Sequence, residues 1–131
     1  LISVMVSACL CEVTVNIKVH GKLSCPKPFS HTVSLWEEDD HTNDFIDEHS
    51  AANSTKSTNF EVSGKAYDGW FEGHVEPLMT IEHNCGSKPG CICKYFNSVD
   101  KDLDTTVDID LVNNNLKSCN SCKDAKRRRY E

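Results

Sequence analysis

Apolar and polar residues alternate with a period of two over several short stretches of this 131-residue chain. The clearest example is residues 13–20, in which every second residue is valine or isoleucine. This pattern is typical of a β-strand with one buried face, and Gly21 lets such a strand bend or bulge. Two prolines within residues 25–28 then break the strand.

The same alternation predicts further strands at residues 31–36, 58–62, 77–83 and 105–111, with a shorter candidate at 45–46. In the last long strand, we expect Val107, Ile109 and Leu111 to face inward. Residues 37–44 are acidic and residues 51–57 are small and polar, so both segments are predicted to be loops.

The helical period of 3.6 residues is absent from every stretch longer than about ten residues. Residues 44–49 are the one weak candidate for a helix. Short strands separated by turn signals therefore predict an all-β fold: an antiparallel, immunoglobulin-like sandwich of about seven strands.

Residues 1–11 carry no charge and are mostly apolar or small. The run is too short to cross a bilayer, and it is typical of the end of a signal peptide with a small-residue cleavage zone. Cleavage after Ala8 or after Cys11 fits this pattern, and an N-terminal strand of the mature fold is the alternative. The sequence thus predicts an extracellular protein with a signal remnant at 1–11, a sandwich domain at 12–122 and a basic tail at 123–131.

Eight cysteines are present, and two of them, Cys9 and Cys11, lie in the predicted signal segment. In a secreted chain the other six predict up to three disulfides among fifteen pairings: Cys25, Cys85, Cys91, Cys93, Cys119 and Cys122. The alternative is that Cys119-x-x-Cys122 is half of a zinc site or a redox motif. Against this, Cys91-x-Cys93 has the wrong spacing for a zinc knuckle, and no βαβ pattern is present.

The formal net charge of −6 is unevenly distributed. The segment 123–131 has five basic and two acidic residues, a sum of +3, so the remainder of the chain carries −9. The acidic remainder repels phosphate and argues against general nucleic-acid binding. The tail is predicted to attract an anionic surface, or alternatively to be a solubilising arm or a processing site.

Five segments, followed by a C-terminal cysteine, resemble the nematode transthyretin-like secreted family in order and spacing. They are Val-His-Gly-Lys-Leu-Ser-Cys at 19–25, Val-Ser-Leu-Trp-Glu-Glu-Asp-Asp at 33–40, Phe-Glu-Val-Ser-Gly at 60–64, Glu-Pro-Leu-Met-Thr-Ile-Glu-His-Asn-Cys at 76–85 and Val-Asp-Ile at 107–109. The resemblance covers roughly residues 13–122. It departs from the family pattern at Asn59, where a glycine is usual, and across residues 65–74.

This resemblance implies a secreted transthyretin-like sandwich without enzymatic activity. One class of members bridges dying cells, which expose phosphatidylserine, to an engulfing neighbour. We therefore expect an extracellular protein that binds phosphatidylserine-containing membranes peripherally and also binds a phagocyte receptor. The alternatives are a carrier that holds a small hydrophobic ligand in a channel between subunits, and a signalling protein with only a protein receptor.

The atypical segment 65–74 places aromatic residues around an Asp-Gly turn, next to basic residues. Aromatics at a loop tip suit a membrane interface or a partner hot spot, and a basic neighbour suits an anionic lipid head. The predicted lipid-binding residues are Lys65, Tyr67, Trp70 and Phe71, assisted by Lys126, Arg127, Arg128 and Arg129 of the tail. The alternative is a hairpin whose aromatics pack into the core.

The acidic stretch offers clustered carboxylates, which calcium prefers as ligands, although the spacing does not fit an EF-hand. The candidate calcium ligands are Asp39, Asp40, Asp44 and Asp47, and a solvated acidic loop is the alternative. No other cofactor is expected. Asn53-Ser-Thr matches the acceptor motif for N-glycosylation.

The six histidines do not lie in a recognisable catalytic signature. The transthyretin fold also hosts a hydrolase of a purine-degradation intermediate, which ends in a Tyr-Arg-Gly-Ser-type sequence. This chain ends Arg-Arg-Tyr-Glu, so that match fails. The sequence therefore predicts a binding protein and not an enzyme.

Overall fold

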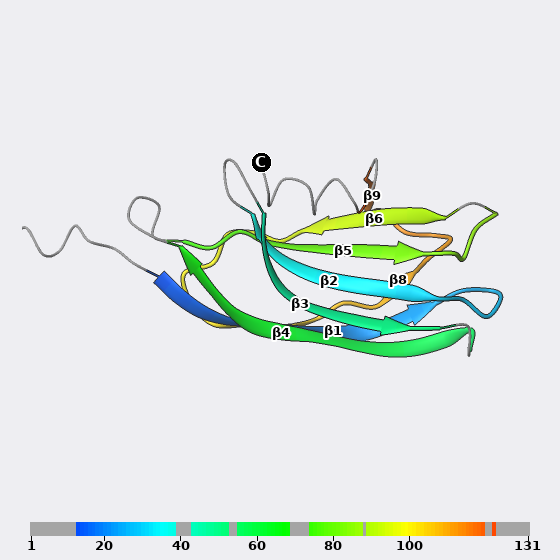
Figure 1. Cartoon of the computed structure of the whole chain (residues 1–131), viewed down its shortest axis with the longest axis horizontal. Helices are drawn as coiled ribbons and strands as arrows, with labels where there is room; N and C mark the ends of the chain where they lie inside the picture. Colours follow the sequence, from blue (N-terminus) through cyan, green and yellow to red (C-terminus); the bar gives the residue numbers. More distant parts are fainter. Residues whose placement is uncertain are drawn as a thin grey trace, which may run out of the picture.

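The computed structural model describes residues 13–38, 43–52, 55–68, 74–87, 89–119 and 122. Two β-sheets pack face to face in this part of the chain, which confirms the predicted all-β sandwich (Figure 1). The strands are β1 (Val13–Ser24), β2 (His31–Glu38), β3 (Asn43–Ala51), β4 (Ser57–Asp68), β5 (Pro77–His83), β6 (Gly90–Tyr95), β7 (Leu103–Thr106), β8 (Ile109–Asp110) and β9 (Lys117–Ser118). Within the described residues, no helix is long and apolar enough to cross a membrane.

The two sheets differ in strand order and direction. Sheet A has the order β4-β1-β7, and β8 also pairs with β1, whereas sheet B has the order β3-β2-β5-β6-β9. The pairs in sheet B and the β1–β4 pair are antiparallel, as predicted. In contrast, β1 runs parallel to β7 and β8. A parallel pair needs a long crossover, and here the crossover contains β2, β3, β5 and β6 of sheet B together with β4 of sheet A.

The main core fills the space between the sheets. Val15, Ile17 and Val19 of β1 are at most 1% exposed, and Val33 and Leu35 of β2 belong to the same buried cluster. Burying each such side chain stabilises the fold by about 1.5–3 kcal/mol relative to exposure. The predicted inward face of residues 13–20 is therefore confirmed for these three residues.

Sheet B has a second, smaller cluster on its outer face. Trp36 and Leu78 are 1% and 2% exposed, and they pack with Cys93 on the side opposite the main core. The Trp36 indole donates a hydrogen bond to Thr80 Oγ1 at 3.0 Å, and its ring meets Phe45 edge-on. Sheet B is thus apolar on both faces along part of β2 and β5.

Gly21 introduces no bulge in the pairing of β1 with β4, which continues in register to Ser24. It lies instead where the neighbouring chain passes from β7 to β8. A Cβ atom on Gly21 would be 1.9 Å from the Val107 carbonyl oxygen. The glycine is therefore required for close backbone approach, which is the other common reason for glycine inside a strand.

Four sequence-based expectations are wrong in their boundaries or type. The single strand predicted at 105–111 is two short strands, β7 and β8, with residues 107 and 108 between them. Residues 44–49 form part of β3 and not a helix, and the acidic segment 37–44 is partly strand at both of its ends. The strand predicted at 58–62 extends over twelve residues as β4. The sequence did not predict β6 or β9, whereas the bounds of β5 agree with the predicted 77–83. Ile109 and Leu111 are buried as expected, and Val107 is partly buried.

Candidate functional site

The described part of the predicted lipid-binding surface lies on strand β4. Lys65 and Tyr67 are two residues apart, so their side chains point to the same face, while Ala66 between them is buried in the core. They lie opposite Asn16 and Thr14 of β1, on the outer face of sheet A. Tyr67 is 52% exposed, so the alternative that the aromatics pack into the core is wrong for this residue.

These two residues belong to a regular strand and not to a loop, because β4 extends through Asp68. A strand holds the spacing between a cation and an aromatic ring more firmly than a loop does. Trp70 and Phe71 lie outside the described residues, as do the tail residues Lys126, Arg127, Arg128 and Arg129. Their place in a lipid-binding surface stays a prediction.

An open depression of about 600 Å³ borders Lys65 on the outer face of sheet A. Lys18 also lines it and forms an ion pair with Glu61 at 3.5 Å. Within the described part of the chain, no ion pair involves Lys65. Lys65 thus brings a second lysine to this depression, next to Lys18.

The opposite side of this depression is acidic and fixed by hydrogen bonds. Asn16 donates from its backbone N–H to Asp102 Oδ1 at 2.8 Å and from its side-chain amide to Oδ2 at 3.2 Å. The backbone bond, followed by the side-chain bond, holds the pKa of Asp102 below its ordinary value. The face thus presents cationic and anionic groups side by side, which suits a zwitterionic head group with an extra negative charge.

Of the four candidate calcium ligands, Asp44 and Asp47 lie on β3, whereas Asp39 and Asp40 lie outside the described residues. The Asp47 carboxylate accepts hydrogen bonds from the backbone N–H groups of Ser63 and Glu48, both at 2.8 Å. The bond to Ser63 joins the edge of sheet B to the edge of sheet A. Asp47 therefore has a structural role, and calcium binding stays a prediction. Asn53 also lies outside the described residues.

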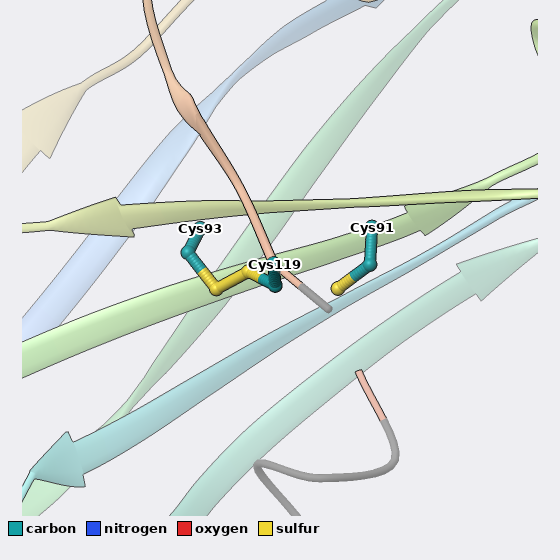
Figure 2. Close-up of side chains that lie close together, drawn as sticks. All are labelled: Cys91, Cys93 and Cys119. Carbon is teal, nitrogen blue, oxygen red and sulfur yellow. A yellow bond between two sulfur atoms is a disulfide. The ribbon is translucent and has the colours of Figure 1, made fainter. Parts of the chain in front are cut away.

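The six predicted disulfide cysteines form three disulfides. Cys25–Cys85 joins the end of β1 in sheet A to the end of β5 in sheet B. The other two pairs, Cys91–Cys122 and Cys93–Cys119, attach the C-terminal part of the described chain to β6. Figure 2 shows Cys91 and Cys93 on one face of β6, with Cys119 between them.

A histidine cluster that the sequence analysis missed lies at one end of sheet B. His31 is 4% exposed and pairs across strands with His83, while its Nε2 lies 3.3 Å from Nδ1 of His49. Burial, and then the charge of His49, lower the pKa of His31; burial also lowers the pKa of His83. The three histidines come from three strands, so only the sheet register brings them together.

The ring nitrogens of this histidine cluster differ in their hydrogen bonds. His83 Nδ1 accepts a hydrogen bond from the Cys85 backbone N–H at 3.1 Å, which engages that nitrogen in a turn. His31 Nδ1 is buried and has no hydrogen-bond partner. No hydroxyl or thiol nucleophile is hydrogen-bonded to these rings in the described contacts. The cluster is therefore an element whose protonation changes the stability of this end of sheet B.

The transthyretin-like resemblance was tested by comparison with protein families. The family model described as TTR-52, Transthyretin-like family, matches residues 20–100. A search of curated proteins finds no match to the chain. The matched span contains β2 to β6 and both Lys65 and Tyr67, and it ends before Cys119 and Cys122. Since the match covers more than half of the chain, the protein belongs to the transthyretin-like family.

Proposed function

We propose that this protein is a secreted, non-enzymatic bridging molecule that recognises phosphatidylserine on dying cells and links them to a phagocyte receptor. Membership of the transthyretin-like family supports a binding protein. Three disulfides are consistent with maturation in an oxidising compartment. The observation that carries the lipid proposal is the outward pair of Lys65 and Tyr67 on β4.

The chemistry of this pair suits an anionic lipid surface. A lysine ammonium attracts phosphate and carboxylate groups, and a half-exposed tyrosine ring can enter the interface while its hydroxyl stays wet. Each basic residue near an anionic membrane contributes about 1 kcal/mol. Lys65 alone therefore gives modest affinity, and the predicted contributions of Trp70, Phe71 and the basic tail are needed for stable binding.

The test measures sedimentation of the protein with vesicles of three compositions: phosphatidylcholine alone, phosphatidylcholine with phosphatidylserine, and phosphatidylcholine with phosphatidylglycerol at the same charge density. The third composition separates recognition of the head group from general attraction to negative charge. Each is measured with calcium and with a chelator. Selective binding to phosphatidylserine is expected in both conditions, and binding only with calcium would instead favour the acidic segment containing Asp44.

Two double variants make the surface assignment specific. Lys65→Gln with Tyr67→Ala should weaken binding at least about fivefold, which is the effect of losing 1 kcal/mol. The matched control is Tyr95→Ala with Lys117→Gln, because Tyr95 is 48% exposed and Lys117 lies 5.6 Å from its ring, on sheet B. Equal effects of the two variants would refute the site, and binding to none of the vesicles would refute the lipid function.

A further inference from the structure

Four cysteines gather on the outer face of β6: Cys91 and Cys93 within the family-matched span, and Cys119 and Cys122 beyond it. Cys91 and Cys93 are two residues apart on the strand, so their side chains share a face (Figure 2). The sulfur atoms of Cys91, Cys93 and Cys119 all lie within 4.8 Å of one another. Cys122 is bonded to Cys91, so the fourth sulfur lies next to this group of three.

Backbone contacts hold this cluster together independently of the disulfides. Strand β9 pairs with β6, with Ser118 opposite Ile92 and Lys117 opposite Cys93. Next to this pair, the Cys119 backbone N–H donates a hydrogen bond to the Cys91 carbonyl at 2.9 Å. Breaking the two sulfur–sulfur bonds would therefore leave at least three thiols close together.

The two disulfides of the cluster are more accessible than the third disulfide of the protein. Each has one partly exposed cysteine, Cys91 or Cys119, bonded to a buried one. Cys25 and Cys85 are each only 6% exposed and belong to the main core between the sheets. Because thiol–disulfide exchange needs access to a sulfur atom, a reductant should open the cluster on β6 first.

We propose that reduction converts this pair of disulfides into a tetrathiolate site for one Zn²⁺ ion, formed by Cys91, Cys93, Cys119 and Cys122. Each disulfide takes two electrons and two protons from a dithiol, which is itself oxidised to a disulfide. Zn²⁺ then binds the four sulfurs as thiolates, and their four protons pass to water.

The geometry and the ligand chemistry agree with this assignment. Zinc–thiolate bonds of 2.3 Å in a tetrahedron place the sulfur atoms about 3.8 Å apart, which lies within the 4.8 Å limit of the cluster. Thiolates select zinc and other soft metals over calcium and magnesium. Cys119-x-x-Cys122 also has the spacing typical of half a zinc site.

The site is tested by titrating the full-length protein with Co²⁺ before and after mild reduction with a trialkylphosphine, which leaves no competing thiol in solution. The reduced protein should bind one Co²⁺ per chain, with the absorption bands of a tetrahedral thiolate site, and Zn²⁺ should displace it. The oxidised protein should show no such bands. Alkylation of the reduced protein, followed by mass mapping, should find four free cysteines and an intact Cys25–Cys85 bond.

Two variants complete the experiment. Cys93→Ser with Cys119→Ser keeps the other two disulfides and should lose the tetrathiolate bands after reduction. Asp44→Asn alters an exposed carboxylate on β3 and should bind Co²⁺ like the wild type. The proposal is overturned if the reduced wild type unfolds in the presence of metal, binds less than one Co²⁺, or binds it no better than the double serine variant.

Discussion

Gly21 offers a sharp test of how closely sheet A is packed. In Gly21→Ala, the new Cβ atom would be 1.9 Å from the Val107 carbonyl oxygen and 2.6 Å from its carbon. The Val107 backbone must then move away by roughly 1.5 Å to reach an ordinary contact distance. Both atoms belong to the backbone, so no side-chain rotation can relieve the clash.

The movement breaks specific hydrogen bonds. Val107 N–H donates to the His20 carbonyl at 2.8 Å, and Lys22 N–H donates to Asp108 Oδ1 at 3.0 Å, on either side of Gly21. Losing these two hydrogen bonds costs about 1 kcal/mol each, and forcing the extra methyl group into the space beside Val107 costs about a further 1–3 kcal/mol. The expected loss is roughly 3–5 kcal/mol of the free energy of unfolding, a large part of the stability of a small domain.

Gly64→Ala is the matched control, because Gly64 pairs across from β1 within the same sheet. Its Cβ atom would be 2.5 Å from Cγ2 of Ile46, a side-chain methyl group that can rotate away. Both variants reduce the entropy of the unfolded chain equally, so their difference isolates the native clash.

The assay is urea unfolding of the disulfide-intact proteins, followed by the fluorescence of buried Trp36. With a typical slope of about 1–3 kcal/mol per molar urea, Gly21→Ala should lower the midpoint by at least about 1 M. Gly64→Ala should cost less than about 1 kcal/mol. A difference below about 1 kcal/mol between the variants would refute the close approach of Val107 to β1.

Three further predictions concern stability. Cys25→Ala with Cys85→Ala opens a loop between cysteines 60 residues apart and should cost about 4 kcal/mol in urea unfolding; a cost below about 1 kcal/mol would contradict the role of this inter-sheet bond. Burial lowers the pKa of His31, so its neutral form favours the folded state, and stability should fall as the pH drops below about 6.5. In His31→Leu, the melting temperature should fall less between neutral and acidic pH than in the wild type. If both proteins lose stability equally as the pH drops, burial of neutral His31 is not the cause. Asp47→Ala leaves the Ser63 amide without its acceptor and should cost about 1–2 kcal/mol, whereas Asp47→Asn, which keeps one acceptor oxygen, should cost less.

The sequence predicted well the strands whose inward positions are all apolar. In β1 and β5 the apolar positions are filled by valine, isoleucine, leucine or methionine, and these side chains are buried. Within β3 it predicted only a short strand at 45–46 and a weak helix over 44–49, because acidic residues and histidine occupy much of that strand, whose pairing with β2 decides its conformation. In β6 the alternate positions are cysteines, which disulfide formation buries or partly buries on the outer face.

The candidate site could be predicted only in part, because strand pairing decides where its residues lie. The composition of residues 65–74 identified Lys65 and Tyr67, but their position on a strand depends on the pairing of β4 with β1. The histidine cluster and the disulfide pairing depend on which strands lie side by side. Pairing of Cys25 with Cys85 follows once β1 and β5 end at the same edge of the sandwich, which local sequence does not encode.

The proposed lipid-binding surface and the cysteine cluster lie on opposite outer faces of the same sandwich. Lys65 and Tyr67 lie on sheet A, while the four cysteines lie on the outer face of sheet B, and the buried core separates the two faces. The inter-sheet disulfide Cys25–Cys85 is buried in that core and is not part of the cysteine cluster. Reducing the cluster should therefore change how the C-terminal segment is held on β6 and leave the lipid-binding face in place. The phosphine-treated protein loaded with zinc should thus retain the vesicle selectivity of the oxidised protein, unless the predicted basic tail that follows Cys122 supplies most of the affinity.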